Sequence, residues 1–186
     1  SLKEIPENLV VVGAGVIGLE LGSHFNTAGS KVTVIEMLPD IGGRLDSDVS
    51  STLRRSLEKK GMVFETEGKV TKFGENEVVF ERNGETFAVP ANKVLVSIGR
   101  RPDTRNKGFE NIGLDVTRAI KTDSKMRTVI PKVYAAGDIN GISLFTHTAY
   151  REAEVFANTL SGKEDHMDYS AIPFAIFTSP EVGGAG

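Results

Sequence analysis

Three glycines near the start of the sequence have the spacing that a phosphate-binding turn requires. Gly13, Gly15 and Gly18 form the pattern G-x-G-x-x-G in "GAGVIG", directly after the aliphatic run "LVVV". Gly13 would permit the tight turn out of a strand, Gly15 would let a pyrophosphate approach the backbone, and Gly18 would let the next helix pack closely. That helix would offer free N–H groups and the positive end of its dipole to the phosphates. The motif therefore predicts a dinucleotide site.

A carboxylate at the end of the next predicted strand indicates which dinucleotide is bound. Glu36 closes "KVTVIE", roughly 20 residues after the glycines, where an acid can accept hydrogen bonds from the two hydroxyls of the adenine ribose. Its charge would repel a 2′-phosphate, so the pattern favours NAD over NADP. Glu20 follows Gly18 in the first turns of the helix, where the helix dipole alone also favours an acid.

The elements that must position these residues alternate between strand and helix. Apolar periodicity and end signals predict strands at 9–12, 31–36 and 62–66 and helices at 16–28 and 46–61. Short runs broken by "GEN" and "NGE" at 68–92 predict an antiparallel meander, and 93–104 begins as a buried strand. We therefore expect an α/β fold, with a Rossmann-like parallel sheet and an inserted three-stranded antiparallel meander.

The second part of the sequence has a different pattern. Residues 118–139 contain two short extended runs and end near "AAGD", and 145–162 predicts an amphipathic helix. Residues 168–186 contain strand-like pieces.

Composition excludes several classes of function. The sequence has no cysteine, and its three histidines lie far apart, so we expect no metal site. The net charge of −3, with basic residues scattered among acids, predicts no nucleic-acid partner. No apolar run approaches the roughly 20 residues of a membrane span, and no signal peptide is evident, so we expect a soluble cytoplasmic protein.

Five motifs in a fixed order suggest a family. They are "GAGVIGLE" (13–20), "VTVIEMLPD" (32–40), "SIGRRPDT" (97–104), "VYAAGD" (133–138) and "HTAYREA" (147–153). On these motifs the sequence resembles the flavin-dependent pyridine nucleotide–disulfide oxidoreductases, which have an FAD/NAD(P)-binding fold. Within that family it is most similar to the dihydrolipoamide dehydrogenases.

The resemblance implies roles for individual residues around NAD. The pyrophosphate would lie against the backbone of Gly13, Gly15, Ile17 and Gly18. Glu20 would lie by the nicotinamide, and Glu36 would hold the adenine ribose. Val70 would lie against the adenine, and Gly99 would let the cofactor pass the "SIGRR" loop.

The resemblance also implies a flavin contact in the second part of the sequence. It assigns Asp138 to the ribityl chain of FAD, and it assigns the start of the following helix to the flavin ring, at Leu144, Phe145, Thr146 and His147. The helix dipole would stabilise negative charge on the ring. The Thr146 hydroxyl is expected to cap this helix.

Family members carry an N-terminal FAD segment with a redox-active cysteine pair and a C-terminal dimerisation domain with a catalytic His–Glu pair. This sequence has neither, so the resemblance implies a fragment in three parts. These are the NAD-binding domain (1–113), the returning segment of the FAD-binding domain (114–161) and the truncated start of the interface domain (162–186). We expect no catalytic residue in the chain, no activity of the chain alone, and an exposed apolar patch at Val155, Phe156 and Leu160.

The implied parent enzyme passes electrons from a dithiol through a disulfide and FAD to NAD⁺. It would be a homodimer, of the kind found in 2-oxoacid dehydrogenase complexes. Related flavoproteins remain as alternatives, namely an NADH oxidase, a coenzyme A-disulfide reductase or a mercuric reductase. A free-standing NAD-binding redox sensor is a third reading, against which "AAGD" argues because its expected partner is a flavin.

Overall fold

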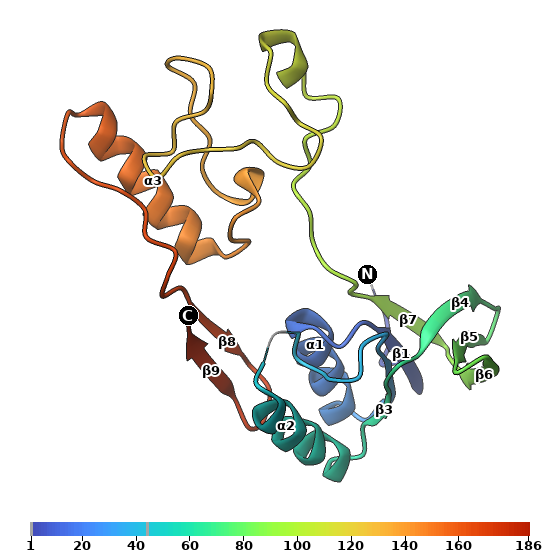
Figure 1. Cartoon of the computed structure of the whole chain (residues 1–186). Coiled ribbons are helices and arrows are strands. Elements are labelled where there is room, and N and C mark those ends of the chain that lie inside the picture. Colours follow the sequence, from blue (N-terminus) through green and yellow to red (C-terminus); the bar gives the residue numbers. More distant parts are fainter. Residues whose placement is uncertain (1, 44) are drawn as a thin grey trace. The chain divides into compact units, whose positions relative to one another are not determined.

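The glycine motif follows the central strand of a parallel sheet. The computed structural model describes residues 2–43 and 45–186. Its main sheet has the strand order β3-β2-β1-β7, with β1 at Asn8–Val12, β2 at Lys31–Ile35, β3 at Val63–Glu65 and β7 at Lys93–Val96 (Figure 1). All three pairings are parallel. The expected α/β fold with a Rossmann-like parallel sheet is confirmed.

Helices α1 (Val16–Thr27) and α2 (Ser47–Lys59) pack on one face of this sheet. Alternate residues of β1 face them, because side chains on a strand point to opposite faces in turn. The buried cluster on this face includes Leu9, Val11, Leu19, Val34, Leu53 and Leu57. Both faces of β1 are buried, which explains why its sequence is a continuous aliphatic run.

The predicted meander covers part of the other face. Strands β4 (Lys69–Phe73), β5 (Glu77–Arg82) and β6 (Glu85–Pro90) form a separate antiparallel sheet in the order β4-β5-β6. The turn from β5 to β6 is Asn83-Gly84, and both residues have positive φ, as a two-residue hairpin turn requires. Phe80 and Val78 of this sheet are buried with Val10, Val12 and Ile35 of the parallel sheet.

Strand β7 is not the buried strand that the sequence suggests. Val94 and Val96 are 38% and 54% exposed, and only Leu95 packs against the helix-side cluster. The physical reason is position, since β7 lies at the edge of the sheet and pairs only with β1.

Residues 100–172 contain little regular structure apart from one helix. The elements are two short 3₁₀ helices, η1 (Phe109–Ile112) and η2 (Asp138–Asn140), and α3 (Thr146–Leu160). The extended runs expected at 118–139 form no strand, and an isolated bridge joins Arg127 and Tyr134.

Helix α3 buries part of the surface that the sequence analysis leaves exposed. Val155 is fully buried against Met126 and Met167, and Phe156 is half-buried beside them, whereas Leu160 is 60% exposed. The expectation of an open apolar patch is therefore wrong at Val155. The reason is that loops flanking α3 supply the apolar partners of its buried face.

The chain divides into two compact units. One contains residues up to Gly99 together with Phe174–Gly184, and the other contains Arg100–Pro173 with Ala185–Gly186. The hairpin of β8 (Pro173–Ile176) and β9 (Val182–Ala185) brings Ile176 into the core of the first unit. The three-part division at 113 and 161 stays a prediction. None of the helices among the described residues has both the length and the apolar character of a membrane span.

Candidate functional site

Gly13 occupies a position that only glycine can fill. It has a φ of +100°, and a Cβ added there would lie 2.6 Å from the carbonyl oxygen of Ser97. Its N–H donates to the carbonyl of Ile35 at 2.8 Å, which ties the turn to the end of β2. The chain leaves β1 by this turn because no other residue combines that φ with so close an approach.

Gly18 allows close packing of α1 on the turn. A Cβ at this position would lie 2.1 Å from the carbonyl oxygen of Gly13 and 2.6 Å from Oγ of Ser97. The Ser97 hydroxyl in turn donates to the Gly13 carbonyl at 3.0 Å. Sequence reasoning did not single out Ser97. The available signal was a polar residue directly after the aliphatic run "KVLV".

Gly15 is different, because open space surrounds it. It is the N-cap of α1, no side chain caps the helix there, and a Cβ would meet nothing within 4 Å. The first N–H groups of an α-helix have no intrahelical partners. Free donors, the helix dipole and the open space beside Gly15 together fit a pyrophosphate. Ile17, in the first turn, is exposed.

Glu36 is anchored beside the glycine turn by two backbone N–H groups. It directly follows β2, its Oε2 accepts the N–H of Ala14 at 2.7 Å, and its Oε1 accepts the N–H of Leu38 at 2.9 Å. Each carboxylate oxygen retains a second acceptor position. The half-buried carboxylate can therefore accept hydrogen bonds from a diol while it keeps both backbone contacts.

The other residues expected around NAD lie in the same unit. Glu20 lies on α1, and one of its carboxylate oxygens accepts the N–H of Phe177 at 2.9 Å. Val70 lies on β4, half-buried against the cluster between the two sheets. Gly99 has a φ of +114° with open space around it. Sequence reasoning missed the contact with Phe177, since its partner is 157 residues from Glu20.

The residues expected around the flavin all lie in the second unit. Asp138 opens η2, and its carboxylate lies 3.4 Å from a guanidinium nitrogen of Arg100. Leu144 is half-buried, and the rings of Phe145 and His147 stack with centroids 5.2 Å apart.

The start of α3 does not have the cap that the sequence suggests. Phe145 is the N-cap residue, and no side chain caps the helix. The Thr146 hydroxyl is therefore not a cap, because Thr146 is already the first helical residue. The buried hydroxyl pair of this region is Ser143 with Thr148, at 2.9 Å. The uncapped start leaves N–H donors free, which fits an electron-rich ring or an anion.

No cluster of histidine or acidic side chains suited to a metal ion occurs among residues 2–43 and 45–186.

Comparisons with known proteins place most of the chain in one family. The profile of the family described as pyridine nucleotide-disulphide oxidoreductase matches residues 1–153. The chain is 39% identical to the mitochondrial dihydrolipoyl dehydrogenase of Mesocricetus auratus and 36% identical to the dihydrolipoyl dehydrogenase of Geobacillus stearothermophilus. Each alignment covers 100% of this chain and 41% of the relative.

Solved structures give the same result. The HOCl-induced flavoprotein disulfide reductase RclA from Escherichia coli, in its Cu(II) complex, is similar with a TM-score of 0.88 at 29% identity. That likeness covers 100% of this chain and 44% of RclA. LpdA from Mycobacterium tuberculosis has a TM-score of 0.87 at 26% identity, over 100% of this chain and 41% of LpdA. From its matching motifs, sequence identity and fold, the chain belongs to the pyridine nucleotide–disulfide oxidoreductases.

Proposed function

We propose that this chain is the NAD-binding part of a flavin-dependent oxidoreductase of the dihydrolipoamide dehydrogenase type. The whole enzyme would pass electrons from a dithiol through a disulfide and FAD to NAD⁺. The names of the relatives at 36–39% identity support this assignment. The chain spans 41% of the length of these relatives, so the activity is proposed for a longer protein.

The observation that carries the proposal is the position of Glu36. Its carboxylate is fixed by the N–H groups of Ala14 and Leu38, directly beside the glycine turn. In this position it would accept both hydroxyls of the adenine ribose, and its charge would exclude a 2′-phosphate. The N–H groups at the start of α1, next to Gly15, would bind the pyrophosphate.

The remaining residues would orient the two cofactors. Glu20 would lie by the nicotinamide, Val70 by the adenine and Gly99 along the path of NAD. Asp138 would bind the ribityl chain of FAD, and the start of α3 would face the flavin ring. When bound, FAD and NAD supply the hydride chemistry, and the residues of this chain hold and orient them.

Assembly and location follow from the same assignment. We propose that the whole enzyme is a homodimer and a component of a 2-oxoacid dehydrogenase complex. A cytoplasmic location stays a prediction, and the Mesocricetus relative is named as mitochondrial.

The test is a fluorescence titration with NADH and NADPH, on the chain and on the natural protein that carries it. We expect NADH to bind more tightly than NADPH, because Glu36 opposes the 2′-phosphate. Glu36→Ala should lower NADH affinity by about tenfold or more, as expected for loss of hydrogen bonds to a charged group.

Glu75→Ala is the matched control, because Glu75 is an exposed acid on the meander. It should leave the affinity for NADH unchanged. Equal binding of NADH and NADPH that Glu36→Ala leaves unaltered would overturn the role of Glu36.

A second candidate differs only in the disulfide that the enzyme reduces. The observation behind it is the likeness to RclA, whose name describes a flavoprotein disulfide reductase and specifies no lipoamide. Assays of the natural protein with lipoamide and with other disulfides, NADH being the reductant, separate the two.

A further inference from the structure

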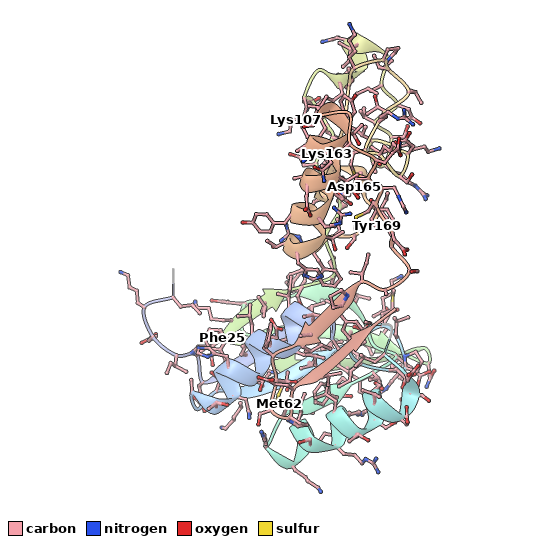
Figure 2. The ribbon with its side chains drawn as sticks, turned by 90° about the vertical axis from the view of Figure 1, so that its left-hand side faces the viewer. Phe25, Met62, Lys107, Lys163, Asp165 and Tyr169 are labelled. Atoms are coloured by element: carbon pink, nitrogen blue, oxygen red, sulfur yellow. The ribbon has the colours of Figure 1, made fainter. Side chains whose placement is uncertain are left out.

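A buried glutamate on α3 is bonded to the turn that carries Asp138. The side chain of Glu152 is completely buried. Its Oε2 accepts the N–H of Gly137, and its Oε1 accepts the hydroxyl of Tyr169 at 2.8 Å. Both partners are donors, so each oxygen of the carboxylate acts as an acceptor. Tyr169 lies beside α3 in Figure 2.

This network is a costly way to pack a helix. A buried carboxylate is unfavourable unless its oxygens are hydrogen-bonded, and an apolar residue would pack α3 at lower cost. Burial, together with the Glu152 carboxylate, raises the pKa of the Tyr169 hydroxyl well above its usual range. Tyr169 therefore stays a hydrogen-bond donor to Glu152 throughout the physiological pH range.

Glu152 acts on a backbone position that needs an external restraint. Gly137 has a φ of +80° and a ψ of −162°, a region that is essentially restricted to glycine. Glycine is also the most mobile residue in the absence of such a restraint. The hydrogen bond from the Gly137 N–H to Glu152 fixes the Ala136–Gly137 peptide, and so the position of the glycine that leads into Asp138.

The same turn has a protected inner side and an accessible outer side. Asn140 at the end of η2 is 5% exposed, and its Oδ1 accepts the N–H of Ile142 at 3.0 Å. The side chain of Asp138 is 43% exposed. The turn is thus held from within by Glu152 and presents the Asp138 carboxylate outward.

We propose that Glu152 is a positioning residue of the FAD site. Its carboxylate fixes Gly137, so that Asp138 is presented in the orientation that the ribityl hydroxyls require. The Tyr169 hydroxyl donates to the second oxygen of Glu152 and so fixes the orientation of the carboxylate. This inference rests on the proposed function, since that function assigns Asp138 to FAD.

The experiment measures FAD affinity in the natural protein that carries this chain. The apoprotein is titrated with FAD, and binding is followed by the quenching of flavin fluorescence. Glu152→Gln keeps the size of the side chain but removes its charge and one acceptor. We expect it to weaken FAD binding by about tenfold, as for a lost hydrogen bond to a charged group. Glu154→Gln, on the exposed side of α3, is the matched control and should bind FAD as the wild type does.

A double-mutant cycle separates positioning from a general loss of structure. If Glu152 acts through Asp138, the effect of Glu152→Gln should largely disappear in a protein that already carries Asp138→Asn. A merely structural role would give the same fold-loss in both backgrounds. The amide resonance of Gly137 supplies a readout without flavin, and its hydrogen exchange should be faster in Glu152→Gln.

The outcomes are distinguishable. A wild-type protein that binds no FAD overturns both the proposed function and this inference. A wild type that binds FAD, with Glu152→Gln binding equally well or with additive effects in the cycle, overturns only the positioning role. If Glu152→Gln does not fold, Tyr169→Phe replaces it, because this variant removes only one of the two hydrogen bonds to Glu152. The same double-mutant cycle with Asp138→Asn then tests the positioning role.

Discussion

At the scale of single residues, two glycines of one motif lack a side chain for different reasons. Gly18 has no room, because a Cβ would lie 2.1 Å from the carbonyl oxygen of Gly13. Gly15 has room and an ordinary φ of −75°, and nothing lies within 4 Å of an added Cβ. The fold therefore requires a glycine at position 18, whereas a bound ligand would require the glycine at position 15.

This difference predicts opposite behaviour of two alanine variants. Gly18→Ala should lower the free energy of unfolding by about 1–3 kcal/mol or more, as overpacking does. Gly15→Ala should change that free energy by less than about 1 kcal/mol, since it affects only the N-cap. It should still weaken NADH binding, because its methyl group enters the space for the pyrophosphate.

Urea denaturation of the chain and NADH titration of the natural protein measure the two effects. A Gly15→Ala variant as unstable as Gly18→Ala would contradict this division, as would one that binds NADH with the affinity of the wild type.

Site residues can be predicted from the sequence when they lie within one short structural unit, because spacing along the chain then determines which of them meet. Gly13, Gly15, Gly18 and Glu36 belong to one strand–turn–helix–strand unit, and the structure places Glu36 directly against the turn. Contacts made across the fold could not be predicted, because a single sequence does not reveal which distant segments meet. Ser97 bonds to Gly13 over 84 positions.

At the scale of elements, the spacing of apolar residues identifies the helices and strands and the face that each of them buries. The alternating strands, the two helices of the first unit and the meander all appear within a few residues of their predicted bounds. Periodicity does not reveal whether a strand is central or at an edge, so it predicts a buried strand where β7 is an exposed edge strand. The expectation that Val155 is exposed rests on the view that residues 114–161 pack on a missing FAD-binding half, and periodicity does not reveal that nearby loops cover the helix instead.

The burial of Val155 gives a prediction for α3. Val155→Ala removes two methyl groups from a fully buried site and should lower the free energy of unfolding by about 2 kcal/mol, at roughly 0.8 kcal/mol per buried carbon plus a cavity cost. Thermal or urea denaturation, followed by circular dichroism, gives the value.

Tyr150→Ala on the same helix is the control, because Tyr150 is 75% exposed. It should change the free energy of unfolding by no more than about 0.5 kcal/mol. An equal effect of the two substitutions would mean that α3 is not packed on Met126 and Met167.

At the scale of the whole molecule, the sequence predicted the fold class and the family, and both are confirmed. The order of five motifs carried that inference, whereas any one of them alone is weak evidence. The sequence did not predict the boundary near Gly99 between the two compact units or the return of Phe174–Gly184 to the first unit. That return depends on packing of Ile176 in a core formed by residues far away in the sequence.

The absence of cysteine from the sequence predicts how the chain behaves in an assay. Lipoamide reduction by NADH needs a redox-active dithiol, so the 186-residue chain should show no turnover above background. A spectrophotometric assay of NADH oxidation measures this, with the natural protein that carries the chain as the positive control. Turnover by the isolated chain would contradict the proposal that the redox-active dithiol lies outside it.

The double anchoring of Glu36 has a consequence for cofactor engineering. The carboxylate that would select the adenine ribose is also the acceptor for the N–H groups of Ala14 and Leu38. A swap to NADP by Glu36→Arg would therefore remove repulsion of the 2′-phosphate and, at the same time, leave the part-buried N–H of Ala14 without its acceptor, whereas water can replace the carboxylate at the exposed N–H of Leu38. A successful redesign must supply a new acceptor for the Ala14 N–H, for example a serine or asparagine at a neighbouring position, before it adds positive charge.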